Sequence, residues 1–483
     1  MKNMTRREAI GGMSLLSGSA LLLGSGCAVN PVTGKSQFML MSEAQEISMG
    51  QQAHADIVKQ YGLYNDTSIG NWFTQRGSSM SQVTHRPNLP WTFTVLDSPV
   101  VNAFAVPGGY VYVTRGILAN FNDEAQFAGV LGHECGHVTA RHTASRYSKA
   151  QLANLGVAIG TIFSETFSQY AQLATLGTTL LFLKYSRDDE RQADQLGVEY
   201  SSLANYDAVA MSEFFYTLER MRPEGAALPE WSSTHPDPGD RIKATRNMAQ
   251  KFQQTHTDMT FARNAESYLD LVDGIVYGDD PRQGYVKNGM FNHPQMSLSF
   301  PVPDGWNVTN MPAEVRMMPE SEEGMLIFTV AQGDTPAGAA NTFTEANGVT
   351  AVSQESITVN NMSGYRLTGT MGDEDQQYGI VSNFISMDGQ VFAFHGLSSV
   401  SGLPGYTATF DATARGFVRL TDSSLKNVSP HKIEVRKVPG TRTFSGALNE
   451  FGVPQDQHEN LAVLNGRELD DSLSTGTRIK IIS

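Results

Sequence analysis

The chain has 483 residues, of which 40% are hydrophobic, and its formal net charge is −14. A chain of this length can bury two or three separate hydrophobic cores. The acidic balance and the absence of a basic run argue against nucleic acid and against anionic lipid as the main partner. The sequence therefore predicts a protein of several domains that does not bind nucleic acid.

The N-terminus is typical of an export signal. Arg6 and Arg7 precede a weakly apolar segment, residues 9–26, that is rich in Gly and Ser and too polar for a convincing membrane span. The segment ends in Leu-Leu-Gly-Ser-Gly-Cys, which resembles a bacterial lipobox, although Gly24 replaces the usual Leu. We expect a signal peptide over residues 1–27 with Cys27 as the lipid-accepting residue; an unmodified cysteine is the alternative.

A helix and a hairpin are expected next. Ser42 to Gln45 matches a capping box and begins a helix. The stretch from Asn102 to Gly109, followed by Tyr110 to Val113, predicts a strand, a Pro-Gly-Gly turn and a second strand. An edge strand beside a metal cleft can hold a peptide by strand addition, so Asn102 and Phe104 are candidate substrate-binding residues. A hairpin inside the core would give the same pattern.

The stretch His133-Glu134-Cys135-Gly136-His137 carries the clearest chemistry. Two histidines four residues apart on a helix share one face and can bind one metal ion, while Glu134 can act as a base toward a water there. Cys135 points to a different face and is expected to be a small buried residue. Asn122 or Asn120 is the expected cap of this helix.

A second helix offers the third ligand that a hydrolytic zinc needs. Glu190 and Asp194 are four residues apart and share a helix face. We expect Glu190 to bind the metal and Asp194 to accept the free ring N–H of a ligand histidine, most plausibly His133. A solvated charged face is the alternative. The apolar segment Leu152 to Leu183 predicts a buried helical hairpin beside the site rather than a membrane helix, and His142 is expected to be structural.

Two further regions follow. Near residue 280 the composition shifts toward strands, which indicates a small α+β domain over residues 280–422. Residues 431–483 predict a strand, two short helices and a strand. This order is similar to a LysM-type βααβ module, which in other proteins binds N-acetylglucosamine polymers such as peptidoglycan. A structural cap is the alternative.

Four stretches together resemble the signature series of the HtpX and CAAX-prenyl-protease metallopeptidases, the gluzincins of peptidase family M48. They occur in the family's order between about residues 30 and 250, and they are Asn102–Gly109, the run that begins at His133, the Glu190 and Asp194 pair, and Thr234–Ile242. The resemblance implies a soluble, secreted zinc endopeptidase with one Zn²⁺ per chain. It also implies that His235 either completes the zinc shell in a closed resting state or, with Arg241, stabilises the oxyanion of the reaction. A structural histidine is the alternative.

The expected fold class is α+β. A mainly helical gluzincin-type peptidase domain with a small sheet (residues 28–275) precedes the α+β domain and the LysM-like module. The expected function is a zinc metalloendopeptidase of the periplasm, lipid-anchored and more plausibly on the outer than the inner membrane. By similarity to the outer-membrane assembly-enhancing proteases, its partners would be misfolded or unassembled envelope proteins. The alternatives are a periplasmic chaperone or scaffold with a closed, latent zinc site, and an accessory protein anchored to peptidoglycan by its tail.

Overall fold

The computed structural model describes residues 27–154, 176–181, 183–221, 231, 235, 239–372 and 377–483. Nearly all of the expected signal peptide lies outside this range, and so does most of the expected helical hairpin between Leu152 and Leu183. Lipidation of Cys27 stays a prediction. Within the described parts of the chain, none of the helices combines the length and the apolar character that a membrane crossing requires.

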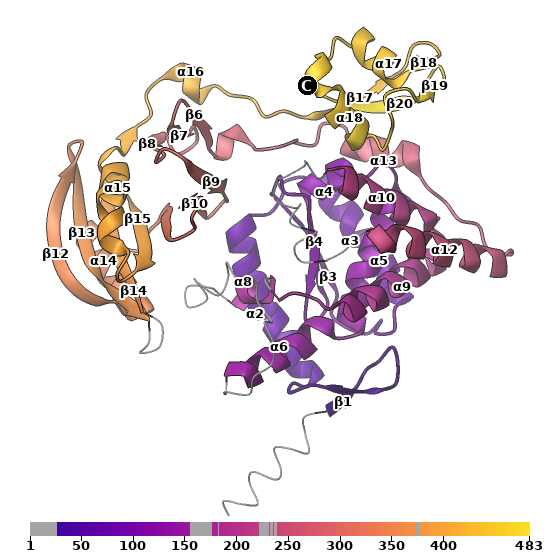
Figure 1. The fold of residues 1–483 in the computed structure, drawn as a ribbon, viewed down its shortest axis with the longest axis horizontal. Helices are drawn as coiled ribbons and strands as arrows, with labels where there is room; N and C mark the ends of the chain where they lie inside the picture. The colour runs from indigo at the N-terminus through magenta and orange to yellow at the C-terminus, as the bar shows by residue number, and fades with distance from the viewer. Residues whose placement is uncertain are drawn as a thin grey trace, which may run out of the picture.

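The first part of the chain is mainly helical around a small sheet, as expected (Figure 1). The sheet has the strand order β3-β5-β4, with β3 parallel to β5 and β4 antiparallel to it at one edge. Its strands are β3 (Thr92–Leu96), β4 (Ala103–Val106) and β5 (Tyr110–Thr114), and a hairpin of β1 (Cys27–Val29) and β2 (Ser36–Phe38) precedes them. The helices are α2 (Glu43–Tyr61), α3 (Thr67–Gln82), α4 (Arg115–Asn120), α5 (Glu124–Thr139), α6 (His142–Asn154), α8 (Leu176–Leu181), α9 (Arg187–Leu203), α10 (Val209–Arg220), α12 (Gly239–Thr255) and α13 (Ala265–Val272).

Two helix starts test the expected caps. The capping box at Ser42 is confirmed, because its side chain accepts from the Gln45 backbone N–H and the Gln45 side chain accepts from the Ser42 backbone N–H. The expected Asn cap of α5 is wrong. Asp123 caps that helix and accepts from the Gln126 backbone N–H at 2.8 Å, whereas Asn120 ends α4 and donates to a carbonyl of its own helix.

Helices α5 and α9 approach each other closely because glycines line their contact. A Cβ atom placed on Gly132 would lie 2.9 Å from the Gly197 carbonyl oxygen, and one on Gly136 would lie 3.0 Å from Cβ of Leu196. Larger residues at these positions would push the helices apart. The close approach brings the α5 histidines within reach of side chains at the start of α9.

The sheet-rich part of the chain has a seven-stranded antiparallel sheet with a helix on each face (Figure 1). Along β14, Ile380 and Phe384 pack with α14, whereas Val381 and Ile385 point to the other face and pack with α15. The sheet, in the order β12-β13-β14-β15-β11-β10-β9, consists of β9 (Trp306–Asn310), β10 (Glu314–Pro319), β11 (Gly324–Val330), β12 (Thr350–Val359), β13 (Met362–Gly372), β14 (Gln377–Met387) and β15 (Gln390–Ser399), and its helices are α14 (Pro336–Asn347) and α15 (Leu403–Arg415). A smaller sheet, in the order β16-β8-β7-β6, contains β6 (Tyr285–Lys287), β7 (Met290–His293), β8 (Leu298–Pro301) and β16 (Val418–Arg419).

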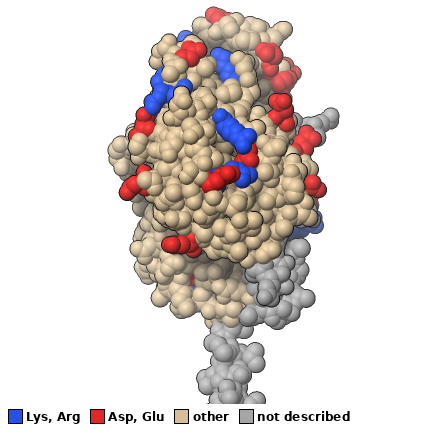
Figure 2. Space-filling view, turned by 90° about the vertical axis from the view of Figure 1, so that its left-hand side faces the viewer, with Lys and Arg blue, Asp and Glu red and all other residues tan. Residues whose placement is uncertain are grey.

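The surface of this part carries scattered charges. Figure 2 shows the molecule from the side of the seven-stranded sheet, and both signs of charge are interspersed among a majority of uncharged side chains. On the described residues of this face, no basic patch of the kind that binds nucleic acid is visible. The view agrees with the sequence, whose acidic residues outnumber its basic ones by 49 to 35.

The tail contains the expected strand, two helices and strand, together with two further short strands and a 3-10 helix. It consists of β17 (Ile433–Lys437), β18 (Arg442–Thr443), α17 (Phe444–Glu450), the short 3-10 helix η3 (Gln455–Gln457), α18 (His458–Leu464), β19 (Ser472–Leu473) and β20 (Arg478–Ile482), with α16 (Ser423–Lys426) preceding it. Strands β17 and β20 pair antiparallel. Phe444, Leu448 and Leu461 belong to the same hydrophobic cluster as Phe121 and Leu218 of the helical part. The tail therefore completes the core of that part.

The chain leaves and re-enters the helical part at one place. The Gly274 backbone N–H donates to the Ile433 carbonyl at 2.8 Å, and the Ile433 N–H donates to the Ile275 carbonyl at 2.9 Å. The sheet-rich part thus connects to the helical part through two adjacent segments (Figure 1).

A buried lysine joins the tail to the segment before α5. The Lys480 ammonium donates to the carbonyl oxygens of Ala119, at 2.8 Å, and Phe121, at 2.9 Å. These carbonyls lie at the end of α4, directly before α5 begins. Burial lowers the pKa of Lys480 from 10.5 to about 7.

We expect this buried amine to make the stability of the protein rise between about pH 7 and pH 10. In that range the folded chain binds fewer protons at Lys480 than the unfolded chain, so deprotonation favours folding. The free energy of unfolding of wild type, measured by urea denaturation relative to Lys480→Met, should increase by about 1–3 kcal/mol from pH 6.5 to 9.5. A difference between the two proteins that does not change with pH would contradict the lowered pKa.

Candidate active site

Helix α5 places His133, Glu134 and His137 in the interior, where each is at most 1% exposed. The two histidine Nε2 atoms are 3.0 Å apart. Burial lowers the pKa of His133 to about 4 and the pKa of His137 well below its ordinary value, so both rings are neutral. Two neutral imidazoles that face each other in this way offer their lone pairs to a common point.

Two more side chains reach this point from outside α5. Glu190, in the first turn of α9, has its Oε1 atom 3.5 Å from His137 Nε2 and its Oε2 atom 3.6 Å from His133 Nε2. His235 has its Nδ1 atom 3.0 Å from Glu190 Oε1 and 3.2 Å from His133 Nε2. One ligand atom from each of His133, His137, Glu190 and His235 lies within 4.8 Å of the others, and all four residues are buried.

These separations fit a zinc ion. Ligands in a tetrahedron at about 2.0–2.1 Å from zinc lie roughly 3.3–3.4 Å from one another, and the separations observed here are 3.0–3.6 Å. Nitrogen and carboxylate oxygen are the donors that Zn²⁺ binds. Both carboxylate oxygens of Glu134 and the Nε2 atom of His235 are buried without a hydrogen-bond partner among the described residues. The group is therefore consistent with a metal site.

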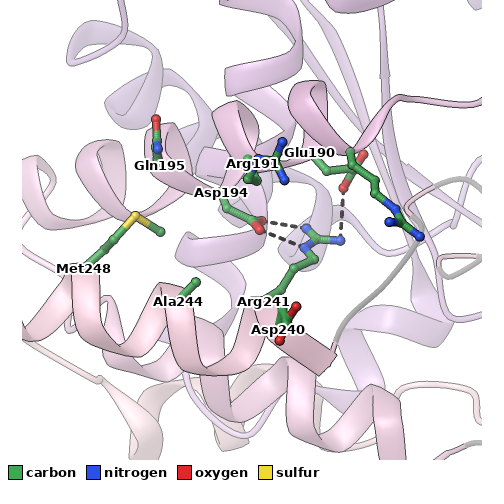
Figure 3. A pocket seen from close by; sticks show the side chains of 9 residues that line it. Glu190, Arg191, Asp194, Gln195, Asp240, Arg241, Ala244 and Met248 are labelled. Carbon is green, nitrogen blue, oxygen red and sulfur yellow. Dashed lines mark hydrogen bonds and ion pairs between the residues drawn. The ribbon is translucent and has the colours of Figure 1, made fainter.

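A carboxylate and a guanidinium, those of Asp194 and Arg241, contact the candidate ligands, and Figure 3 shows Arg241 paired with both Asp194 and Glu190. Asp194 Oδ1 accepts from His133 Nδ1 at 3.1 Å, which leaves the His133 Nε2 lone pair directed at the other ligands. Arg241, on α12, donates to both oxygens of Asp194, at 2.6 and 2.8 Å, and lies 3.0 Å from Glu190 Oε2. Burial alone would raise the pKa of Asp194, but Arg241 and the His133 hydrogen bond bring it below its ordinary value.

A cavity of about 300 Å³ lies between α9 and α12, beside the ion pair of Arg241 with Asp194 (Figure 3). Met248 and Ala244 form part of its apolar wall, and Glu190, Asp194 and Arg241 lie at its polar end. Arg241 thus lines the cavity and also lies 3.5 Å from His133 Nδ1.

Aromatic rings enclose the histidines on the other side. Trp231 stacks on His235 with 4.2 Å between ring centroids, and Tyr185 stacks on His137 at 3.8 Å. His235 Nε2 lies 3.7 Å from Glu134 Oε1. In this arrangement His235 occupies the place of a fourth ligand and also faces the Glu134 carboxylate, so the site is closed.

The structure brings most of the predicted site residues together in one group. These are His133, Glu134, His137, Glu190, Asp194, His235 and Arg241. Two predicted residues lie apart from it. Phe104 is on the expected edge strand, but its ring stacks on Tyr112 in the core, and the buried Asn102 Oδ1 has no hydrogen-bond partner among the described residues. Substrate binding by Asn102 and Phe104, and oxyanion binding by Arg241, stay predictions.

Sequence reasoning missed three side chains of the site. Trp231 and Tyr185 do not belong to any metal-ligand motif. The available signal was only that each is an aromatic residue close in sequence to a candidate ligand, His235 or Glu190. His142 was expected to be structural, yet its Nδ1 atom is 3.0 Å from Nδ1 of His137. The available signal was a third histidine five residues after His137, but a five-residue spacing does not place two side chains on one helix face.

An HExxH helix joined by a buried glutamate from a second helix defines a metallopeptidase domain. Residues 70–249 match the family described as Peptidase family M48. This region is therefore an M48 metallopeptidase domain with an intact candidate zinc site.

The chain is also similar to curated proteins that are named as proteases. The chain is 28% identical over 232 residues to the Beta-barrel assembly-enhancing protease of Escherichia coli, covering 46% of this chain and 47% of that protein. It is 34% identical over 160 residues to the Mitochondrial metalloendopeptidase OMA1 of Arabidopsis thaliana, covering 33% and 32%. The matches thus span about half the length, or less, of these relatives.

Two solved structures are similar to smaller parts of the chain. Cyanobacterial PsbP from Synechocystis covers 27% of this chain and 91% of its own, with 13% identity and a TM-score of 0.24. LpqN of Mycobacterium tuberculosis, involved in cell envelope biogenesis, covers 25% and 82%, with 11% identity and a TM-score of 0.21. Similarity at this level does not indicate a shared function.

Proposed function

We propose that the protein is a zinc endopeptidase in which His133, His137 and Glu190 bind one Zn²⁺. The observation that carries the proposal is the convergence of these three buried donors from two helices beside Glu134, whose carboxylate has no hydrogen-bond partner in the part of the chain that the structure describes. When bound, Zn²⁺ would polarise the scissile carbonyl and lower the pKa of water toward about 7.

Glu134 is the proposed general base. It accepts the proton of the attacking water and delivers this proton to the leaving amine. Burial and, after it, the neighbouring Glu190 carboxylate raise the pKa of Glu134 well above its ordinary value. A carboxylate with a raised pKa binds a proton more readily near neutral pH, as this double role requires. Asp194 and Arg241 keep His133 and Glu190 in place.

We also propose that the closed arrangement is a resting state. His235 occupies the fourth position and lies against Glu134, so a substrate can enter only when the His235 side chain leaves this place. A latent protease and a zinc-bound chaperone or scaffold share this closed geometry. They differ in whether removal of His235 releases activity.

The His235→Ala variant decides between these two functions. If the open form is about 1–10% populated in wild type, removing the fourth ligand should raise casein cleavage by about 10–100-fold, with one zinc ion retained per chain. Casein turnover and zinc content would be measured on wild type, His235→Ala and the control His431→Ala, which replaces an exposed histidine of the tail. A zinc-loaded His235→Ala protein as inert as wild type would favour the chaperone or scaffold.

The proposed substrates are misfolded or unassembled proteins of the bacterial cell envelope. Similarity to the Beta-barrel assembly-enhancing protease of Escherichia coli supports this substrate class and a periplasmic location. Anchoring through a lipidated Cys27, and on the outer membrane, remains part of the proposal. So does peptidoglycan binding by the tail, which only its strand-helix-helix-strand order supports. Because the tail shares its core with the peptidase domain, sacculus binding should be measured on the full chain.

A further inference from the structure

His142 is held against the zinc ligand His137 by an unusual turn. Helix α5 ends at Thr139 and α6 begins at His142, and Arg141 between them has a φ of 61°, in the left-handed region. A residue other than glycine adopts this conformation only where its surroundings hold it. Here the Arg141 guanidinium donates to the buried Glu46 carboxylate at 2.7 Å and to the Met41 carbonyl at 3.1 Å. The turn directs His142 back toward α5.

The contact between the two rings fixes which nitrogen carries the hydrogen. His142 Nδ1 lies 3.0 Å from His137 Nδ1, and His142 Nε2 lies 3.0 Å from Gln192 Oε1 and 3.9 Å from Asp189 Oδ1. Both of these oxygens can only accept, so the hydrogen of the neutral His142 ring is on Nε2. His142 Nδ1 is then an acceptor, and His137 Nδ1–H is its donor. The lone pair of His137 is thereby left on Nε2, which faces His133 and Glu190.

We propose that His142 is a positioning residue that fixes the tautomer and orientation of the ligand His137, with Gln192 fixing His142 in turn. The inference rests on the proposed zinc function. His142 does for His137 what Asp194 does for His133, but without a negative charge. Three carboxylates, Glu134, Glu190 and Asp194, already share this buried site with the Arg241 guanidinium. A neutral acceptor orients the second histidine without adding a fourth buried charge.

Zinc affinity is the measurement that tests the proposal. In His142→Leu, which removes the acceptor at similar volume, the dissociation constant for Zn²⁺ should rise about 10–100-fold, measured by competition with a chromophoric chelator. In His142→Asn the Oδ1 atom takes the place of Nδ1 and can accept from His137, so the dissociation constant should stay within about threefold of wild type. The melting temperature of each zinc-free protein reports whether it folds.

Three results would have distinct meanings. Equal zinc affinity in wild type, His142→Leu and His142→Asn would overturn the positioning role, and so would an equal loss in both variants. If His142→Leu fails to fold, Gln192→Met takes its place: weaker zinc binding supports the proposal and unchanged binding overturns it. A wild-type chain that binds no zinc would instead contradict the proposed function itself, and the proposal with it.

Discussion

Replacing Glu134 with Gln should lower the rate of peptide hydrolysis by about 10²–10⁴-fold while the protein stays folded and keeps its zinc. Gln has nearly the same shape as Glu but cannot accept the proton of the attacking water. Glu134 is not in the group of four candidate metal-binding side chains, so its loss should leave zinc content unchanged. Because the resting site is closed, casein turnover would be measured in the His235→Ala background.

The neighbouring residue provides the control. Cys135 is fully buried and packs in the hydrophobic core on a different face of α5, so Cys135→Ala should change the rate little. A zinc-loaded Glu134→Gln protein that cleaves casein at the rate of its parent would show that Glu134 is not the base. Loss of zinc in this variant would show that Glu134 is a ligand instead.

Replacing Arg241 with Ala should lower the free energy of unfolding of the zinc-free protein by about 3–5 kcal/mol. Arg241 is 7% exposed and is paired with Asp194 and Glu190, which are also buried. Its removal leaves both carboxylates without their cation. Arg191→Ala is the control, because Arg191 forms an exposed ion pair with Asp188 and its loss should cost less than about 1 kcal/mol in the same urea denaturation.

The same variant separates two roles of Arg241. If Arg241 holds the carboxylates, Arg241→Ala loses stability and zinc affinity together. If instead it mainly binds the oxyanion of the reaction, the variant keeps both and loses only kcat. In this closed structure the Arg241 guanidinium contacts Asp194, Glu190, His133 and the Phe215 ring, which favours the first outcome.

Much of the candidate metal site could be predicted from the sequence because four of its side chains come in two local pairs. His133 with His137, and Glu190 with Asp194, each lie one helical turn apart, so the spacing alone places them on one face. His142 could not be predicted in this way, because its position depends on the left-handed Arg141 that buried partners from the start of the chain hold in place. Local spacing carries no information on such partners.

The fold, too, could be predicted where the sequence pattern is local and could not be predicted where it depends on distant contacts. The α+β class was predicted and is confirmed, as a helical domain followed by a sheet-rich region. Strands β12 and β14 were not predicted, and each lacks the usual alternation. β12 is an exposed edge strand with few buried residues. β14 is buried on both faces, so its burial does not alternate from one residue to the next. The docking of the tail through Lys480 depends on contacts more than 350 residues apart.

The position of the sheet-rich region determines an order of events during synthesis. The ribosome makes residues from about 280 to 430 after α5 and α9 but before β17 and β20, which complete the core around those helices. Until β20 has emerged, the Ala119 and Phe121 carbonyls lack the Lys480 amine, and Phe121 and Leu218 lack the tail residues of their cluster. The core of the helical part therefore stays incomplete while the sheet-rich region is translated. It can be completed only when β17 to β20 are available to pack against it.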